Sequence, residues 1–343
     1  DDVNREFDEI GANYNAYTAS ELTCFHANVL PEHLDTATDI LGDILRPALR
    51  QDDFDTEKSV ILEEIAMYKD HPFWVLYERA MEEYYGDHPL AHRVLGTDQS
   101  ITDLTRDQMQ TYFDARYSSD NTVVALAGRL NFRKCVEQIN QLCGGWKRTG
   151  ARRDGARPTP RDRDFTIHDE RVSRAYLLQV SPGPSIQDEN RYAAMMLAKV
   201  LGDPGNSRLH WSLIETGIAE DCQAAYDPRD GCGDFYIYAS GEPDRTQEIW
   251  RLVQKEVDGL VDSLTADDLE LLRNRLATSV TLAGERPGGR MQRLGRLWTY
   301  LGEYTPLEEE LARINAVTLD GLRDVFRQYP FSPRTLGRLL PAE

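Results

Sequence analysis

Two stretches of alternating apolar and polar residues recur along the chain, and each leads into a helical pattern. Residues 12–30 contain the runs ANYNAYTAS and LTCFHANVL, which are joined by a polar turn and alternate as strands do. Residues 220–243 contain the comparable runs EDCQAAYDP and GDFYIYASGEP. Pro31 and Pro243 each precede apolar residues at helical spacing, and proline suits the first turn of a helix. The pattern predicts two hairpins, each followed by a helix.

The two halves of the chain share an order of elements. Ala16-Tyr17 corresponds to Ala225-Tyr226, Phe25 to Phe235 and Pro31 to Pro243. A further strand is predicted in each half, at residues 121–130 (NTVVALAGRL) and at residues 174–183 (RAYLLQVSPG). A repeat of about 210 residues is far longer than the units of a solenoid, so the pattern indicates a duplicated domain.

The grouping of these elements predicts the fold class. Strands in clusters with helices in runs favour antiparallel sheets that carry helices on one face. Residues 147–164 are rich in Arg, Gly and Pro and nearly free of apolar residues, as is typical of a linker. We therefore predict an α+β fold of two homologous antiparallel-sheet-plus-helices sandwich domains that face each other, an N-terminal one over residues 1–146 and a C-terminal one over residues 165–343.

Composition narrows the class of partner. The chain has 343 residues, of which 41% are apolar, and this is enough for two cores. Its formal net charge of −19 argues against nucleic acid or an anionic membrane surface as a partner and leaves a peptide open. No apolar run has the length of a membrane span. Five cysteines without CxxC spacing indicate neither a disulfide framework nor a thiolate zinc site. A reducing compartment is therefore expected: the cytoplasm is the predicted location, and the periplasm is the alternative.

A predicted helix within residues 54–72 places carboxylates in its most apolar part. Glu63 and Glu64 stand between the runs VIL and IAM. Glu57 and Glu64 are seven residues apart and so lie within about 20° of the same helix face, whereas Glu63 points elsewhere. Spacing alone favours a surface helix whose acids pair with Lys58 and other cations.

Four segments of the first half resemble one known family in their order and intervals. They are FDEIGANYNAYTAS, VLPEHLDTATDILGDIL, FDTEKSVILEEIAMY and HPLAHRVLGTDQSI. Together they resemble the first domain of the insulinase and mitochondrial-processing-peptidase family of zinc proteases, in its short bacterial branch. The resemblance extends over essentially the whole chain and is strongest in residues 1–130.

The resemblance implies a zinc site. In this family an H-x-x-E-H motif supplies two His ligands and a Glu general base, and a Glu from a second helix is the third ligand. The family pattern V-x-x-E-E-I implies that Glu64 is this ligand and that Glu57 is the acid that contacts a ligating histidine. Such partners would compensate the desolvation of a carboxylate in an apolar stretch.

The H-x-x-E-H motif itself does not occur in these residues. His88 and His92 lack the intervening Glu, and Pro89 opposes a continuous helix, so we expect no zinc role for them. The other histidines, which have no acid or His partner at ligand spacing, are expected to be structural: His26, His33, His71, His168 and His210. Counting about 75 residues back from Glu64, the family interval, passes residue 1, where the chain opens as a helix already under way, so we expect a truncated motif. The alternative is a family member that never had it.

The strand within residues 12–20 resembles the family's active-site edge strand, which binds an extended substrate by adding it to the sheet. The implied substrate-binding residues are Asn15, Ala16, Tyr17 and Thr18. Without the resemblance, the pattern indicates a plain strand with Tyr14 inward and Asn15 outward.

The second half departs from the family at the positions of an Arg and a Tyr that commonly hold substrate. Glu220 stands at the Tyr position, and Leu213 or Ile214 stands where the Arg would be. Arg208 is nearby but out of register. The usual contribution of the second half to catalysis is therefore in doubt.

The sequence as a whole predicts a fragment of a zinc metalloendopeptidase that hydrolyses peptides or processes presequences. In the complete protein zinc would activate water and the motif Glu would be the general base. The fragment itself is expected to be inactive and not to retain zinc. The alternative is a noncatalytic scaffold or partner subunit, in a homodimer or in a heterodimer with a family member. A third reading, an unrelated peptide-binding module, requires Glu64 to face solvent.

Overall fold

The computed structural model describes residues 2–152, 155 and 157–342. Three residues of the predicted linker, Arg153, Asp154 and Ala156, lie outside the described residues. Backbone contacts divide the chain into a first unit of Asp1–Ile65, Val94–Asp154 and Ala283–Tyr304 and a second unit of Ala66–Arg93, Gly155–Leu282 and Thr305–Glu343. Each unit therefore combines segments from both halves of the sequence, and the predicted division at residues 147–164 stays a prediction about homology.

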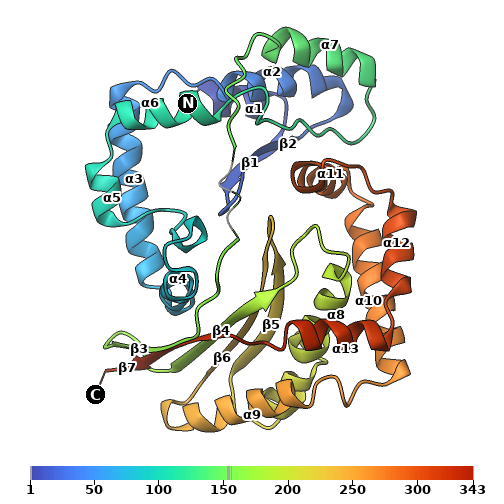
Figure 1. The fold of residues 1–343 in the computed structure, drawn as a ribbon. Coiled ribbons are helices and arrows are strands. Elements are labelled where there is room, and N and C mark those ends of the chain that lie inside the picture. The colour runs from blue at the N-terminus through green and yellow to red at the C-terminus, as the bar shows by residue number, and fades with distance from the viewer. Residues whose placement is uncertain (1, 153–154, 156, 343) are drawn as a thin grey trace. The chain divides into compact units, whose positions relative to one another are not determined.

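The first unit contains the predicted N-terminal hairpin. Strands β1 (Asn13–Thr18) and β2 (Thr23–Asn28) pair antiparallel, as the alternation predicted (Figure 1). The helices of this unit are α1 (Asp2–Glu9), α2 (Leu34–Ile44), most of α3 (Gln51–Lys69), α5 (Asp98–Asp103), α6 (Arg106–Arg116), α7 (Phe132–Cys143) and α11 (Pro287–Leu301). The buried ring of Phe7 stacks on Tyr14 with ring centroids 4.2 Å apart. This contact packs α1 against one face of the hairpin.

The strand predicted at residues 121–130 is not formed. Described residues 122–127 belong to no strand, and Val123 and Val124 are 41% and 53% exposed. In the first unit, β1 and β2 pair with each other and with no other described strand. An extended segment becomes a strand only when a neighbour accepts and donates its backbone hydrogen bonds, so an apolar alternating sequence was insufficient here.

The second unit is built on a mixed five-stranded sheet with the strand order β3-β7-β4-β6-β5. The strands are β3 (Arg163–Asp169), β4 (Ala175–Gly183), β5 (Asp221–Pro228), β6 (Gly233–Gly241) and β7 (Thr335–Pro341). The pair β3 and β7 is parallel, whereas the other pairs are antiparallel. The α+β class is confirmed. The prediction of wholly antiparallel sheets was wrong, because β3 and β7, which are distant in the sequence, pair in parallel at one edge of this sheet. β3 also begins at Arg163, within the predicted linker.

Helices cover both faces of this sheet, where the sequence predicted one covered face (Figure 1). Leu177 of β4 packs into a core with α8 (Arg191–Gly202), α9 (Thr246–Asp258), α10 (Ala266–Ala283), α12 (Leu307–Ala316) and α13 (Leu319–Gln328). The next residue, Leu178, packs into a second core against α4 (Pro72–Tyr85). Alternate residues of a strand point to opposite faces, so both faces of β4 are buried. This explains its nearly continuous apolar sequence.

The two hairpins share their surroundings but not their register. Each is followed by a short 3₁₀ turn, Pro31–His33 or Pro243–Arg245, and then by a helix. Phe25 lies opposite Ala16, whereas its sequence counterpart Phe235 lies opposite Tyr226. A shift of one residue moves side chains to the other face of a strand. The repeat is therefore one of element order, not of individual residue pairs.

No helix of the described residues is both long enough and apolar enough to cross a bilayer.

Candidate active site

Helix α3 carries both acids that the sequence singled out. It runs without a break over Gln51–Lys69, with acids in its first turn and Lys69 in its last turn, which suits the helix dipole. Glu64 is partly buried beside the buried Ile65, whereas Glu57 and Glu63 are exposed. Glu64 makes no hydrogen bond or ion pair with another described residue. A partly buried carboxylate without a partner can accept a cation or a donor from another group.

Strand β1 presents an edge without a strand neighbour. It pairs with β2 on one side, and no described strand lies on its other side. Tyr17 is 46% exposed, and the Ala16 amide donates to Asn15 Oδ1 at 2.8 Å. The Ala16 amide is therefore bound by a side chain of its own strand. A free edge with exposed side chains can accept a further strand.

One face of the hairpin gathers polar and aromatic side chains. Tyr17 lies opposite Cys24, and the rings of Tyr17 and His26 are 6.4 Å apart. Burial and the neighbouring Cys24 thiol raise the pKa of Tyr17, and Arg296 on α11 opposes this rise. The phenol of Tyr17 is therefore a neutral hydrogen-bonding group in the physiological pH range.

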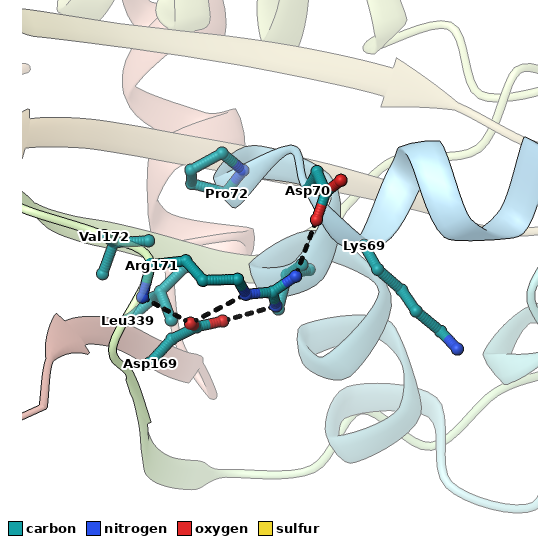
Figure 2. Close-up of a pocket in the computed structure, with 8 residues that line it drawn as sticks. Lys69, Asp70, Pro72, Asp169, Arg171, Val172 and Leu339 are labelled. Carbon is teal, nitrogen blue, oxygen red and sulfur yellow. Dashed lines mark hydrogen bonds and ion pairs between the residues drawn. The ribbon is translucent and has the colours of Figure 1, made fainter.

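The corner between α3 and α4 lines a small pocket in the second unit, of about 190 Å³ (Figure 2). Arg171 spans its wall: Nε and Nη2 donate to the two oxygens of Asp169 at 3.0 and 2.7 Å, and Nη1 donates to Asp70 at 2.7 Å. Hydrogen bonds from Arg171 lower the pKa of Asp169 to about 2. Because two carboxylates already bind this guanidinium, Arg171 is not free to bind an anionic ligand in the pocket.

A buried polar network, which was not predicted from the sequence, joins α4 to the hairpin β5–β6. Asp234 is 1% exposed and accepts from Arg229 Nε at 3.0 Å, from the Tyr236 hydroxyl at 3.2 Å and from the Tyr85 hydroxyl. Arg229 Nη2 also donates to the Tyr236 hydroxyl at 2.8 Å. Burial raises the pKa of Asp234, and the Arg229 guanidinium opposes this rise. The signal in the sequence was a single acid at the start of the apolar run GDFYIYASG.

Comparison with known proteins identifies the family. Residues 1–98 match the insulinase family, peptidase family M16, and residues 103–276 match the peptidase M16 inactive domain. The chain is 31% identical over 339 residues to an uncharacterized zinc protease of Streptomyces coelicolor, and the alignment covers 95% of this chain and 73% of that relative. The chain belongs to peptidase family M16. The resemblance that the sequence analysis stated is therefore confirmed.

Other M16 relatives and solved structures agree. The uncharacterized zinc protease YmxG of Bacillus subtilis is 27% identical over 344 residues, which cover 99% of this chain and 84% of that protein. A protease from Helicobacter pylori superposes with a TM-score of 0.89 at 18% identity, over 99% of this chain and 84% of that one. A peptidase M16 inactive domain from Pseudomonas fluorescens superposes with a TM-score of 0.91 at 19% identity, over 99% and 83%. These structures establish an M16-like α+β fold.

The described residues do not make a complete zinc site. M16 relatives are named zinc proteases, and a catalytic zinc needs three protein ligands. Across residues 2–152, 155 and 157–342, no three His, Cys, Asp or Glu side chains are grouped so as to hold a metal. Pro89–Ala91 forms a 3₁₀ turn, and His88 Nδ1 accepts from the Leu90 amide. Glu64 is therefore at most one ligand of a set that other residues would complete.

The M16 positions for Arg and Tyr in the second unit carry other interactions. Glu220 is exposed and pairs with Arg174 at 2.7 Å. Leu213 is buried in the core of the second unit. Arg208 lies 3.4 Å from Asp268 and donates to the Ser263 carbonyl. These side chains stabilise the second unit and present neither a phenol nor an uncommitted guanidinium.

Proposed function

We propose that this chain contributes the substrate-binding strand and one zinc ligand to an M16-type metalloendopeptidase that hydrolyses peptides or processes presequences. Glu64 would be the ligand, Glu57 would contact a ligating histidine, and Asn15–Thr18 would bind the peptide. By itself the chain would be inactive, because its sequence lacks H-x-x-E-H. The observation that carries the proposal is Glu64, a partly buried carboxylate without a partner at the family position of the ligand.

The peptide-binding part of the proposal is supported by the free edge of β1. The backbone of an extended peptide would pair with the groups of β1 that face away from β2, which gives affinity without sequence preference. Exposed side chains such as Tyr17 would contact alternate residues of the peptide. To bind there, the peptide must displace the Asn15 side chain from the Ala16 amide.

The homology of the two halves is part of the same proposal. Both hairpins lead through a proline-initiated 3₁₀ turn into a helix, which supports descent from one α+β unit by duplication. The arrangement of two such halves facing each other remains a proposal.

A pair of neighbouring acids provides the test. The protein would be prepared in a longer form that carries an H-x-x-E-H helix ahead of residue 1, and Glu64→Gln would be compared with Glu63→Gln. Glu64→Gln is expected to abolish stoichiometric zinc, because glutamine is a poor replacement for an anionic ligand, whereas exposed Glu63 is dispensable. Zinc content by elemental analysis and peptide hydrolysis would be measured. Retention of zinc in Glu64→Gln would refute the assignment.

The second candidate is a noncatalytic partner subunit, and the observation that favours it is Glu220 at the position of the family tyrosine, paired with Arg174. A subunit of this kind would associate with an active family member as a heterodimer or with itself. Sequencing of the gene around the codon for residue 1 separates the candidates, because an intact H-x-x-E-H favours the enzyme and a degenerate one favours the partner subunit. Size-exclusion chromatography with light scattering would measure the association.

A further inference from the structure

Within the second unit, a line of aromatic rings leads from the last turn of α3 to the sheet. The ring of Tyr68 lies 5.4 Å from Trp74, Trp74 lies 5.6 Å from Tyr77, and Tyr77 lies 5.9 Å from Tyr236. We call these four residues the aromatic ladder. We propose that Tyr68 and Trp74 are positioning residues that hold the turn of α3 bearing Glu64. The consequence for Glu64 rests on the proposed function, whereas the restraint on α3 does not.

The aromatic ladder begins one helical turn after Glu64. Tyr68 follows Glu64 by four residues in one unbroken helix, so the two side chains are neighbours on one helix face. Two residues, Asp70 and His71, separate the end of α3 from α4, and their amides donate to the carbonyls of Met67 and Tyr68 at 3.1 Å. Because the connection is short and hydrogen-bonded, the position of α4 restrains the last turn of α3.

Helix α4 is fixed to the sheet. Its residues Leu76, Ala80 and Tyr84 are fully buried, and the Tyr85 hydroxyl donates to the buried Asp234. The Arg229 guanidinium that pairs with Asp234 also approaches the Tyr77 hydroxyl at 3.4 Å. The aromatic ladder therefore ends at Tyr236, which is bonded to the buried ion pair of Arg229 and Asp234.

An ion pair also links the corner between α3 and α4 to the sheet. Arg171 and Asp70 form an ion pair at 2.7 Å, but their side chains are 57% and 75% exposed. Exposed ion pairs contribute little, since water and salt compete for both partners. Edge-on and tilted aromatic contacts are less sensitive to salt and have a preferred geometry. Trp74 is 36% exposed, and its ring contacts Tyr68 on one side and Tyr77 on the other.

Hydrogen exchange of the chain as given tests the restraint without zinc or activity. Tyr68→Leu removes the ring, Tyr68→Phe keeps it, and Met67→Ala changes the neighbouring side chain, which is 71% exposed. Amides of residues 61–69 are expected to exchange about tenfold faster in Tyr68→Leu than in Tyr68→Phe or Met67→Ala. The exchange rates of the β4 amides should be the same in all three variants. Equal exchange in Tyr68→Leu and Met67→Ala would overturn the proposal.

Trp74 gives a second variant if Tyr68→Leu fails to fold. Trp74→Leu should accelerate exchange in residues 61–69 to a similar extent, whereas Trp298→Leu, at a 53% exposed tryptophan of α11, should leave these amides unchanged. No effect of Trp74→Leu would also overturn the proposal. In the longer form with H-x-x-E-H, Tyr68→Leu should weaken zinc binding about tenfold and Tyr68→Phe should restore it. If Glu64→Gln kept its zinc, the proposed function would be refuted. The restraint on α3, measured by hydrogen exchange in Tyr68→Leu, would still stand.

Discussion

The Tyr85 hydroxyl donates a hydrogen bond to the Asp234 carboxylate, although 149 positions separate the two residues in the sequence. This contact joins α4 to β6 inside the second unit, where Asp234 is 1% exposed. It is one of three hydrogen bonds that satisfy a buried acid, together with those from Arg229 and Tyr236. The unit therefore depends on a polar network at the point where α4 covers the sheet.

Loss of the buried acid should destabilise the second unit strongly. Asp234→Ala removes the buried partner of Arg229 and leaves this buried charge with the half-exposed Asp227 alone, so a loss of about 3–5 kcal/mol in the free energy of unfolding is expected. Tyr85→Phe removes one donor and should cost about 1–3 kcal/mol. Urea denaturation followed by circular dichroism measures both. Tyr112→Phe, at a 62% exposed tyrosine of α6, is the control and should stay within about 0.5 kcal/mol of the wild type.

The chain as given should bind no stoichiometric zinc at micromolar metal. Glu64 provides a single carboxylate, and a catalytic zinc site needs three protein ligands. Elemental analysis after dialysis against zinc is the measurement. One tightly held zinc per chain would contradict the expectation and would direct attention to His88 and His92.

Proline in β1 should separate peptide binding from metal binding. In the longer form with H-x-x-E-H, Ala16→Pro removes the amide that Asn15 Oδ1 binds, so peptide hydrolysis should fall at least tenfold while zinc content is unchanged. Asn13→Pro, at the first residue of the strand, is the control, because proline is tolerated there. Full turnover by a folded Ala16→Pro protein would mean that the substrate does not pair with this edge.

The Asp169–Arg171 pair should persist well into the acid range. The folded pKa of Asp169 is lowered to about 2, below the ordinary value, so its contribution to stability is complete above about pH 4 and is lost as the pH falls toward 2. Carboxyl resonances followed by NMR during acid titration measure this pKa. Arg171→Gln should return the midpoint toward the ordinary range. A midpoint near 4 in the unmodified chain would show that the bidentate pair does not form in solution.

The sequence predicted the local elements well. Alternation in residues 12–30 and 220–243 identified both hairpins, and the spacing of Glu57 and Glu64 placed them on one face of a single helix. These features follow from the periods of strand and helix, which each segment carries by itself. The position of Glu64 within an apolar run is likewise a property of the sequence alone. Its role as a ligand stays a prediction.

Tertiary structure decided what depends on partners distant in the sequence. The alternating residues 122–127 form no strand because no described strand pairs with them, whereas β3 pairs parallel with β7 from the other end of the second half. α4 covers the second face of the sheet, and Asp234 is tolerated in the core because Arg229 and Tyr85 meet it there. Periodicity records which face of a segment is apolar. Which segment covers that face, and which donor reaches a buried acid, follows from long-range packing alone.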